Sequence, residues 1–218
     1  MRCVLALSLL VLSCGSAPQQ RVVEARRLKG AIIKARMERL GMPYPPNRVY
    51  LRAFKTEKVL EVWVAPATGV YKLFGSYPIA RMSGGLGPKK QEGDYQVPEG
   101  RYHIDRFNPY SAYHLSLGLN YPNATDRKRS AGLKPGGDIF IHGSNVSIGC
   151  LAMTDDLIRE IYLVALDARR KPVRVDIFPM RMEGAAFGRA FREAPTEWKE
   201  LWRRLQPAYI GFEKTRKL

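Results

Sequence analysis

The sequence predicts an α+β domain that is mainly β, built on a curved mixed β-sheet or sandwich with flanking helices. Many short segments are rich in β-branched and aromatic residues, and stretches rich in glycine and proline separate them. Helical periodicity is confined to one segment near each end and one inside the chain. A chain of 218 residues, 45% of them hydrophobic, can build one good core with helical appendages.

The first residues predict an export signal over residues 1–19. One basic residue, Arg2, precedes an apolar stretch that is too short to span a bilayer of about 30 Å. The segment Val11–Cys14 resembles a lipobox, at which bacterial signal sequences are cut before a lipidated cysteine. Cys14 is therefore a candidate lipid anchor to the membrane, and a plain cut after Ala17 is the alternative.

Residues 20–47 are expected to form a basic amphipathic helix followed by a proline-rich linker. Within Glu24–Leu40 the helical period places four apolar residues near one face, namely Leu28, Ile32, Ala35 and Leu40. Packing on the domain and binding to a membrane surface are the two interpretations of this helix. The prolines from Pro43 to Pro46 end it, because proline cannot continue a helix.

Residues 48–180 are expected to form the main domain. Its predicted strands are Val49–Phe54, Val59–Val64, Val70–Ile79, Tyr102–Phe107, His114–Leu119, Asp138–His142 and Val173–Phe178. A helix is expected over Thr154–Ala168, with Leu157, Ile161, Val164 and Ala165 toward the core. Residues 181–218 are expected to be a C-terminal helical extension, helical over Phe187–Leu205, that packs on the domain through Trp198, Trp202 and Leu205.

The charge predicts an anionic partner. The formal net charge is +16, which suits nucleic acid, an anionic membrane or a carboxylate-bearing cell-wall polymer. Export excludes nucleic acid, and no nucleic-acid-binding motif is visible. For most of the individual charges, a solvated basic surface without a specific ligand is the preferred interpretation.

The cysteine pattern singles out Cys150. The chain has three cysteines, and Cys3 and Cys14 fall in or just after the apolar run at the start. An exported chain with one interior cysteine has no internal disulfide partner. The thiol of Cys150 is therefore either functional or a buried, inert group.

A short polar loop joins His142 to Cys150, which is typical of a thiol nucleophile with its base. The helix after the cysteine, with Thr154 as its N-cap, would favour negative charge nearby. The amides of Gly149 and Cys150 could stabilise an oxyanion. A catalytic Cys150 is expected to have a lowered pKa and to alkylate quickly near neutral pH, whereas a structural thiol should resist the reagent.

No metal and no cofactor are expected. His103 and His114 lie in strand-like segments without acidic or cysteine partners at ligand spacing. Asp138 would share a strand face with His142, but an aspartate after two glycines is more typical of a turn than of a catalytic triad.

Several motifs carry a resemblance to a known family. His-Gly at 142–143, a short loop, Ser-Ile-Gly-Cys at 147–150 and Ala-Met-Thr-Asp at 152–155 occur in this order, together with Ser83–Lys89, Gly93–Asp94, Pro98–Gly100, Tyr121–Asn123 and Phe178–Met182. Over roughly residues 48–215 the chain resembles the L,D-transpeptidase (YkuD-type) catalytic domain family, most closely its YafK-like branch.

The resemblance implies roles for five residues. Cys150 would be the nucleophile that acylates on a peptidoglycan stem peptide, and His142 the general base and then the general acid. The backbone carbonyl of Gly143 would orient the His142 ring. Ser147 and Gly149 would shape the turn, and the amides around Gly149 would form the oxyanion hole.

The chain departs from the mainstream pattern Ser-His-Gly-Cys-x-Arg. Ile148 precedes Gly149, and Ala152 stands where the arginine would be. Losing that arginine removes a bidentate clamp for a substrate carboxylate. The candidate replacements are Arg127, Lys134 and Arg181.

The resemblance implies an exported enzyme of the periplasm or cell envelope that acts at the L-centre carbonyl of diaminopimelate. Its expected partners are peptidoglycan and a murein-linked lipoprotein, which an amidohydrolase would release. A transpeptidase that forms cross-links or attaches lipoprotein is the alternative within the enzyme class. A non-catalytic peptidoglycan-binding module is the alternative from another class.

Overall fold

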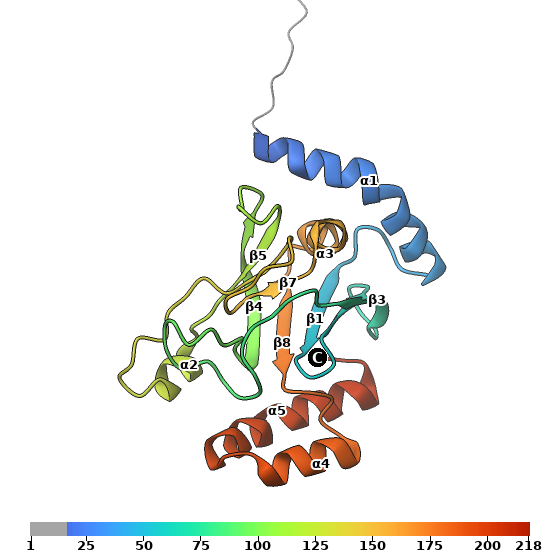
Figure 1. The fold of residues 1–218 in the computed structure, drawn as a ribbon. Helices are drawn as coiled ribbons and strands as arrows, with labels where there is room; N and C mark the ends of the chain where they lie inside the picture. Colours follow the sequence, from blue (N-terminus) through green and yellow to red (C-terminus); the bar gives the residue numbers. More distant parts are fainter. Residues whose placement is uncertain (1–16) are drawn as a thin grey trace, which may run out of the picture.

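The computed structural model describes residues 17–218, and its centre is one sheet of eight strands in the order β3-β2-β1-β8-β4-β5-β6-β7 (Figure 1). The strands are β1 (Arg48–Phe54), β2 (Val59–Ala65), β3 (Lys72–Pro78), β4 (Gly100–Asn108), β5 (Ser116–Leu119), β6 (Phe140–His142), β7 (Leu151–Ala152) and β8 (Arg174–Phe178). The pairs β1–β8 and β6–β7 are parallel, and the other pairs are antiparallel. The predicted mixed sheet is confirmed.

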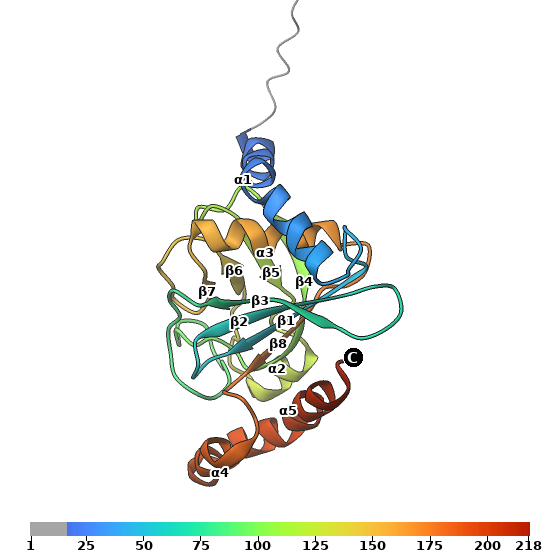
Figure 2. The same ribbon diagram turned by 90° about the vertical axis from the view of Figure 1, so that its right-hand side faces the viewer.

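Helices cover both faces of the sheet. The helices α1 (Ala17–Arg39) and α3 (Asp155–Asp167) lie on one face, and α4 (Gly184–Glu193) and α5 (Thr196–Thr215) on the other, as Figure 2 shows. A short helix, α2 (Ala124–Arg129), follows β5. No helix of residues 17–218 is long and apolar enough to cross a membrane.

The central strand β1 shows why both faces are covered. Val49, Leu51 and Ala53 belong to the main core beneath α1 and α3. Tyr50 and Phe54 point the other way, into clusters that α5 completes. Because successive side chains of a strand alternate between faces, the nearly continuous apolar run of β1 is buried on both sides.

The predicted strands and the predicted helix before β8 form within a few residues of their expected bounds. Helix α2 and strand β7, which has two residues, were not predicted. The C-terminal helix is two helices, because Pro195 separates α4 from α5. Trp202 and Leu205 are buried against the sheet, as expected.

The predicted buried face of α1 is wrong. Leu28 and Ile32 are exposed, whereas Ala25, Ile33 and Met37 are buried in the main core. The helix begins seven residues earlier than predicted, at Ala17. Polar contacts that periodicity does not reveal fix its rotation; they include Lys29 with Asp156 at 2.7 Å, Arg26 with Asp167 and Arg36 with Glu160.

Arg21 ties α1 to the loop between β4 and β5. Its Nη1 donates to the carbonyl oxygens of Pro109 (3.3 Å), Ser111 (2.7 Å) and His114 (2.7 Å). A guanidinium has five donors in a rigid fork, so one arginine can satisfy several backbone carbonyls of a loop. The predicted export signal, including Cys3 and Cys14, lies outside the described residues except for its last three residues, which begin α1.

Candidate active site

His142 and Cys150 meet at the edge of the sheet. Strand β6 ends at His142, and β7 begins directly after Cys150. The parallel pairing sets His142 opposite Ala152, and the Phe140 amide lies 3.4 Å from the Cys150 sulfur. Diagonal neighbours of this kind lie roughly 7–8 Å apart in backbone position. The register therefore brings the two predicted catalytic residues together.

Strand alternation turns both side chains away from the main core. Ile141 and Leu151, which pair with each other, belong to that core. Their neighbours His142 and Cys150 project to the opposite face of the sheet. His142 is 2% exposed, and Cys150 is half-buried with a free thiol.

The Gly143 carbonyl oxygen lies 2.6 Å from Nδ1 of His142. A carbonyl only accepts, so Nδ1 carries the proton and Nε2 keeps a lone pair that can accept one. Position 143 admits no side chain: a Cβ there would lie 2.6 Å from a carboxylate oxygen of Asp155 and 2.7 Å from the Tyr113 carbonyl oxygen. Glycine is therefore required where the chain leaves β6.

Tyr113 covers the imidazole. Its ring lies 4.7 Å from that of His142, measured between centroids, at an interplanar angle of 33°. The tyrosine comes from the loop that Arg21 holds, and 44% of it is exposed. No sequence signal marks Tyr113, because the contact joins residues that the sheet pairing alone brings together.

The pKa of the Cys150 thiol is raised, not lowered as expected for a catalytic cysteine. Burial raises the pKa of Cys150, and the amide of Phe140, which donates to the sulfur, opposes that shift only in part. Burial also lowers the pKa of His142, against the bond with Gly143.

Ser147 organises the loop before the cysteine. Its Oγ accepts from the amides of Cys150 (3.0 Å) and Gly149 (3.3 Å) and donates to the Cys150 carbonyl oxygen (2.7 Å). Gly149 has φ +123°, a conformation that glycine alone adopts readily. The amides expected to bind an oxyanion are thus held by Ser147 in this state.

Thr154 is the N-cap residue of α3, as predicted, but its side chain makes no capping hydrogen bond. It has φ +69° and so lies outside the usual N-cap conformation. Asp155 instead accepts from the amide of Ser144 at 2.7 Å and thereby braces the start of the loop.

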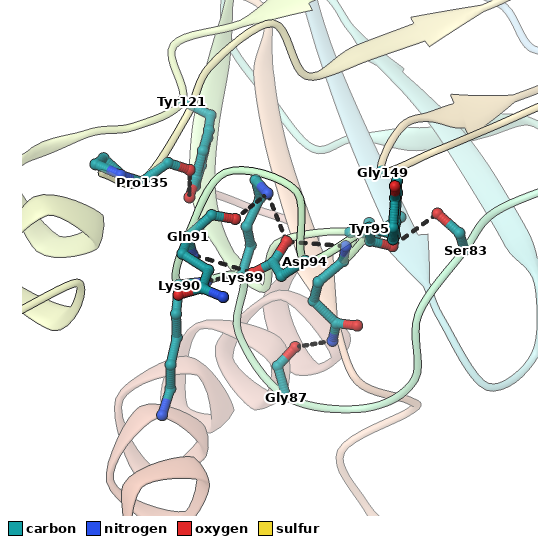
Figure 3. A network of polar contacts seen from close by, with 12 residues as sticks. Ser83, Gly87, Lys89, Lys90, Gln91, Asp94, Tyr95, Tyr121, Pro135 and Gly149 are labelled. Atoms are coloured by element: carbon teal, nitrogen blue, oxygen red, sulfur yellow. Dashed lines mark hydrogen bonds and ion pairs between the residues drawn. The ribbon is translucent and has the colours of Figure 1, made fainter. Parts of the chain in front are cut away.

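A second loop, residues 80–99, borders the site. The carboxylate of Asp94 holds this loop together. It accepts hydrogen bonds from Lys89 (2.5 Å) and from the backbone amides of Lys90 and Gln96 (Figure 3). The Gln96 carbonyl oxygen lies 3.5 Å from where a Cβ of Gly149 would be. The loop therefore packs against the turn that carries the cysteine.

The three predicted carboxylate-binding residues do not come together. Arg127 is exposed on α2, and Lys134 is exposed in the loop that follows it. Arg181 lies beyond β8, where it pairs with Glu61 at 2.7 Å. Asp138 is exposed in a turn with φ +54° and pairs with Arg106 at 3.1 Å, which suits a turn residue and not a triad member.

No group of three histidine, cysteine, aspartate or glutamate side chains within residues 17–218 is placed to hold a metal ion. His103 lies on β4, and His114 lies in the loop before β5 with φ +70°.

Known proteins are similar to this chain in sequence and in fold. The family model of the L,D-transpeptidase catalytic domain, YkuD, matches residues 50–175. YafK of Escherichia coli (strain K12), itself assigned only provisionally as an L,D-transpeptidase, is 40% identical over 174 residues, which cover 78% of this chain and 68% of YafK.

A solved structure is also similar, that of the helical cell shape determining protein Pgp2 from Campylobacter jejuni. It has a TM-score of 0.52 and 27% sequence identity, and the match covers 62% of this chain and 49% of Pgp2. The chain thus spans about half the length of that protein. From the family match and the identity to YafK, the chain belongs to the L,D-transpeptidase (YkuD-type) catalytic domain family.

Proposed function

We propose that the chain is an exported cysteine enzyme that cuts peptidoglycan stem peptides at the L-centre carbonyl of diaminopimelate. Family membership supports a peptidoglycan-related substrate. The observation that carries the proposal is the pairing of β6 with β7, which sets the free thiol of Cys150 beside a histidine whose Nδ1 is engaged by the Gly143 carbonyl. That geometry supplies a nucleophile and a base with its accepting nitrogen free.

The reaction would proceed through a thioester. The Cys150 thiol gives its proton to Nε2 of His142, and the sulfur electron pair bonds to the carbonyl carbon. His142 returns that proton to the departing amine nitrogen as the C–N bond breaks, which leaves an acyl group on the sulfur. Water then attacks the thioester, its proton passes through His142, and a carboxylic acid and the free thiol result. The Gly149 and Cys150 amides, in the loop that Ser147 positions, would stabilise the oxyanion during attack.

The identity of the second nucleophile separates the candidate outcomes. Attack by water makes the enzyme an amidohydrolase that releases murein-bound lipoprotein, which is the outcome we favour. Attack by an amine would make it a transpeptidase that forms cross-links or attaches lipoprotein. Export to the periplasm or envelope, with Cys14 as the candidate lipid anchor, belongs to the same proposal.

The test is mass spectrometry of the products formed from tetrapeptide muropeptides and from lipoprotein-linked muropeptides. Wild-type protein spanning residues 17–218 is compared with Cys150→Ala. Released lipoprotein that depends on Cys150 supports the amidohydrolase. New cross-links or exchanged terminal D-amino acids would identify a transpeptidase instead, and no Cys150-dependent product from either substrate would leave the binding module as the function.

The pH dependence of kcat/KM should report the neutral thiol and imidazole. The productive state needs unprotonated Nε2, and burial lowers the pKa of His142 from 6.5, so kcat/KM should rise through a midpoint below pH 6.5. It should fall only as the Cys150 thiol ionises, above its ordinary value of 9.0, because His142 then has no proton for the leaving amine. An ascending limb centred above pH 7 would contradict this assignment.

Replacing Ser147 with alanine should slow the reaction. The substitution removes the acceptor that positions the amides of Gly149 and Cys150, and small misplacements of reacting groups cost about 10- to 100-fold in rate. We expect kcat to fall by about that factor while the far-ultraviolet circular dichroism is unchanged. Ser147→Thr, which keeps the hydroxyl, is the matched control. A Ser147→Ala protein with wild-type kcat would show that the loop needs no such brace.

A further inference from the structure

Four residues from neighbouring segments form a row across the edge of the sheet. Ser116 of β5 pairs with His142 of β6, His142 pairs with Ala152 of β7, and Ala152 pairs with Arg81, which precedes the Gly-rich loop. Directly paired residues of adjacent strands project to the same face. Arg81 therefore emerges on the face that carries His142, two strand positions away.

The backbone of Arg81 is fixed. The Ala152 amide donates to the Arg81 carbonyl oxygen at 2.9 Å, and the Arg81 amide donates to the Ala152 carbonyl oxygen at 3.3 Å. Adjacent strands lie about 4.8 Å apart, so the α-carbons of Arg81 and His142 are about 10 Å apart. A long arginine side chain that starts there can reach a ligand held at the imidazole.

The side chain of Arg81 is exposed and available to bind a ligand. Within residues 17–218 its guanidinium has no hydrogen-bond or ion-pair partner. Other arginines at this side of the molecule are engaged, as in the pair of Arg106 with Asp138. Ala152, which is fully buried, is the one residue between Arg81 and His142 in this row.

We infer that Arg81 binds a carboxylate of the acyl donor and so determines which stem peptides are accepted. The inference rests on the proposed function, because diaminopimelate carries a carboxylate at its second centre in addition to the L-centre carbonyl that reacts. A guanidinium binds a carboxylate through two parallel hydrogen bonds, which fixes orientation as well as affinity. Arg127, Lys134 and Arg181, the candidates predicted from the sequence, lie outside the row that contains Arg81 and His142.

The first test needs no peptidoglycan. Cys150 is alkylated at about pH 9 with iodoacetate, which carries a carboxylate, and with iodoacetamide, which is neutral and nearly the same size. Intact mass gives both rates. A charge-assisted bond from Arg81 should favour iodoacetate, so the ratio of the two rates should fall by about fivefold in Arg81→Gln. Arg81→Lys should keep part of the preference, and Arg127→Gln, a matched exposed arginine, should leave the ratio unchanged.

The second test uses the proposed substrate. Arg81→Gln should raise KM for a muropeptide with a free diaminopimelate carboxylate by about tenfold, with little change in kcat. It should leave KM unchanged for the same muropeptide with that carboxylate amidated. An alkylation ratio equal in Arg81→Gln and wild type overturns the inference. If the wild-type enzyme cuts no muropeptide, the proposed function fails, and the alkylation ratio still decides the role of Arg81.

Discussion

Replacing Cys150 with alanine is expected to remove activity on stem peptides, with a loss of at least about 10⁴-fold in kcat. The sulfur is the atom that would hold the acyl group, and no other cysteine is present in residues 17–218. His142→Gln should cost nearly as much, since Nε2 of His142 would accept the thiol proton in the proposed reaction. Product formation is measured by liquid chromatography with mass detection over long incubations.

The double variant sharpens this prediction. Residues that act as one unit lose their effect together, so Cys150→Ala combined with His142→Gln should be no slower than Cys150→Ala alone. Thermal melting of each variant controls for folding. Appreciable stem-peptide cleavage by folded Cys150→Ala would exclude the thioester route.

Replacing Glu99 with alanine is expected to lower the free energy of unfolding by about 3–5 kcal/mol. Glu99 is fully buried and accepts from Nζ of Lys55 (3.1 Å), the amide of Gly87 (2.6 Å) and Nε1 of Trp202 (2.7 Å). Its removal leaves the ammonium of Lys55 buried without a counter-charge. Burial already lowers the pKa of Lys55, and Glu99 is the main group that opposes this shift.

Urea unfolding, followed by Trp fluorescence, measures this effect through the midpoint and the slope. Glu197→Ala, which breaks an ion pair with Lys90 at the surface, is the matched control and should cost no more than about 1 kcal/mol. Adding Lys55→Met to Glu99→Ala should recover part of the loss in unfolding free energy, because the charge of Lys55 is then no longer buried without its partner. If Glu99→Ala lowered the free energy of unfolding by no more than Glu197→Ala does, water would have to replace the Glu99 carboxylate.

The strands could be predicted where local composition decides them. The runs that became β1 and β2 are rich in β-branched and aromatic residues and are buried on both faces, so their signal is strong. Strand β7, with two residues, has no period to detect. The rotation of α1 could not be predicted, because ion pairs to α3 help to decide it and most of its surface is polar.

The residues of the candidate site also divide into those that the local sequence reveals and those that only long-range contacts bring in. His142, Gly143, Ser147, Gly149 and Cys150 lie within nine consecutive positions, so one motif reveals them all. Tyr113 and Arg81 reach the same place only through pairing across the sheet. Contacts between distant segments leave no local pattern, so the sequence alone does not mark Tyr113 or Arg81.

The hydrogen bonds from Arg21 to the β4–β5 loop have a practical consequence for the production of this protein. A recombinant version that begins after Arg21 would leave the carbonyls of Pro109, Ser111 and His114 to water and loosen the loop that rests Tyr113 on the imidazole. We therefore expect the choice of first residue to affect the activity of the purified protein.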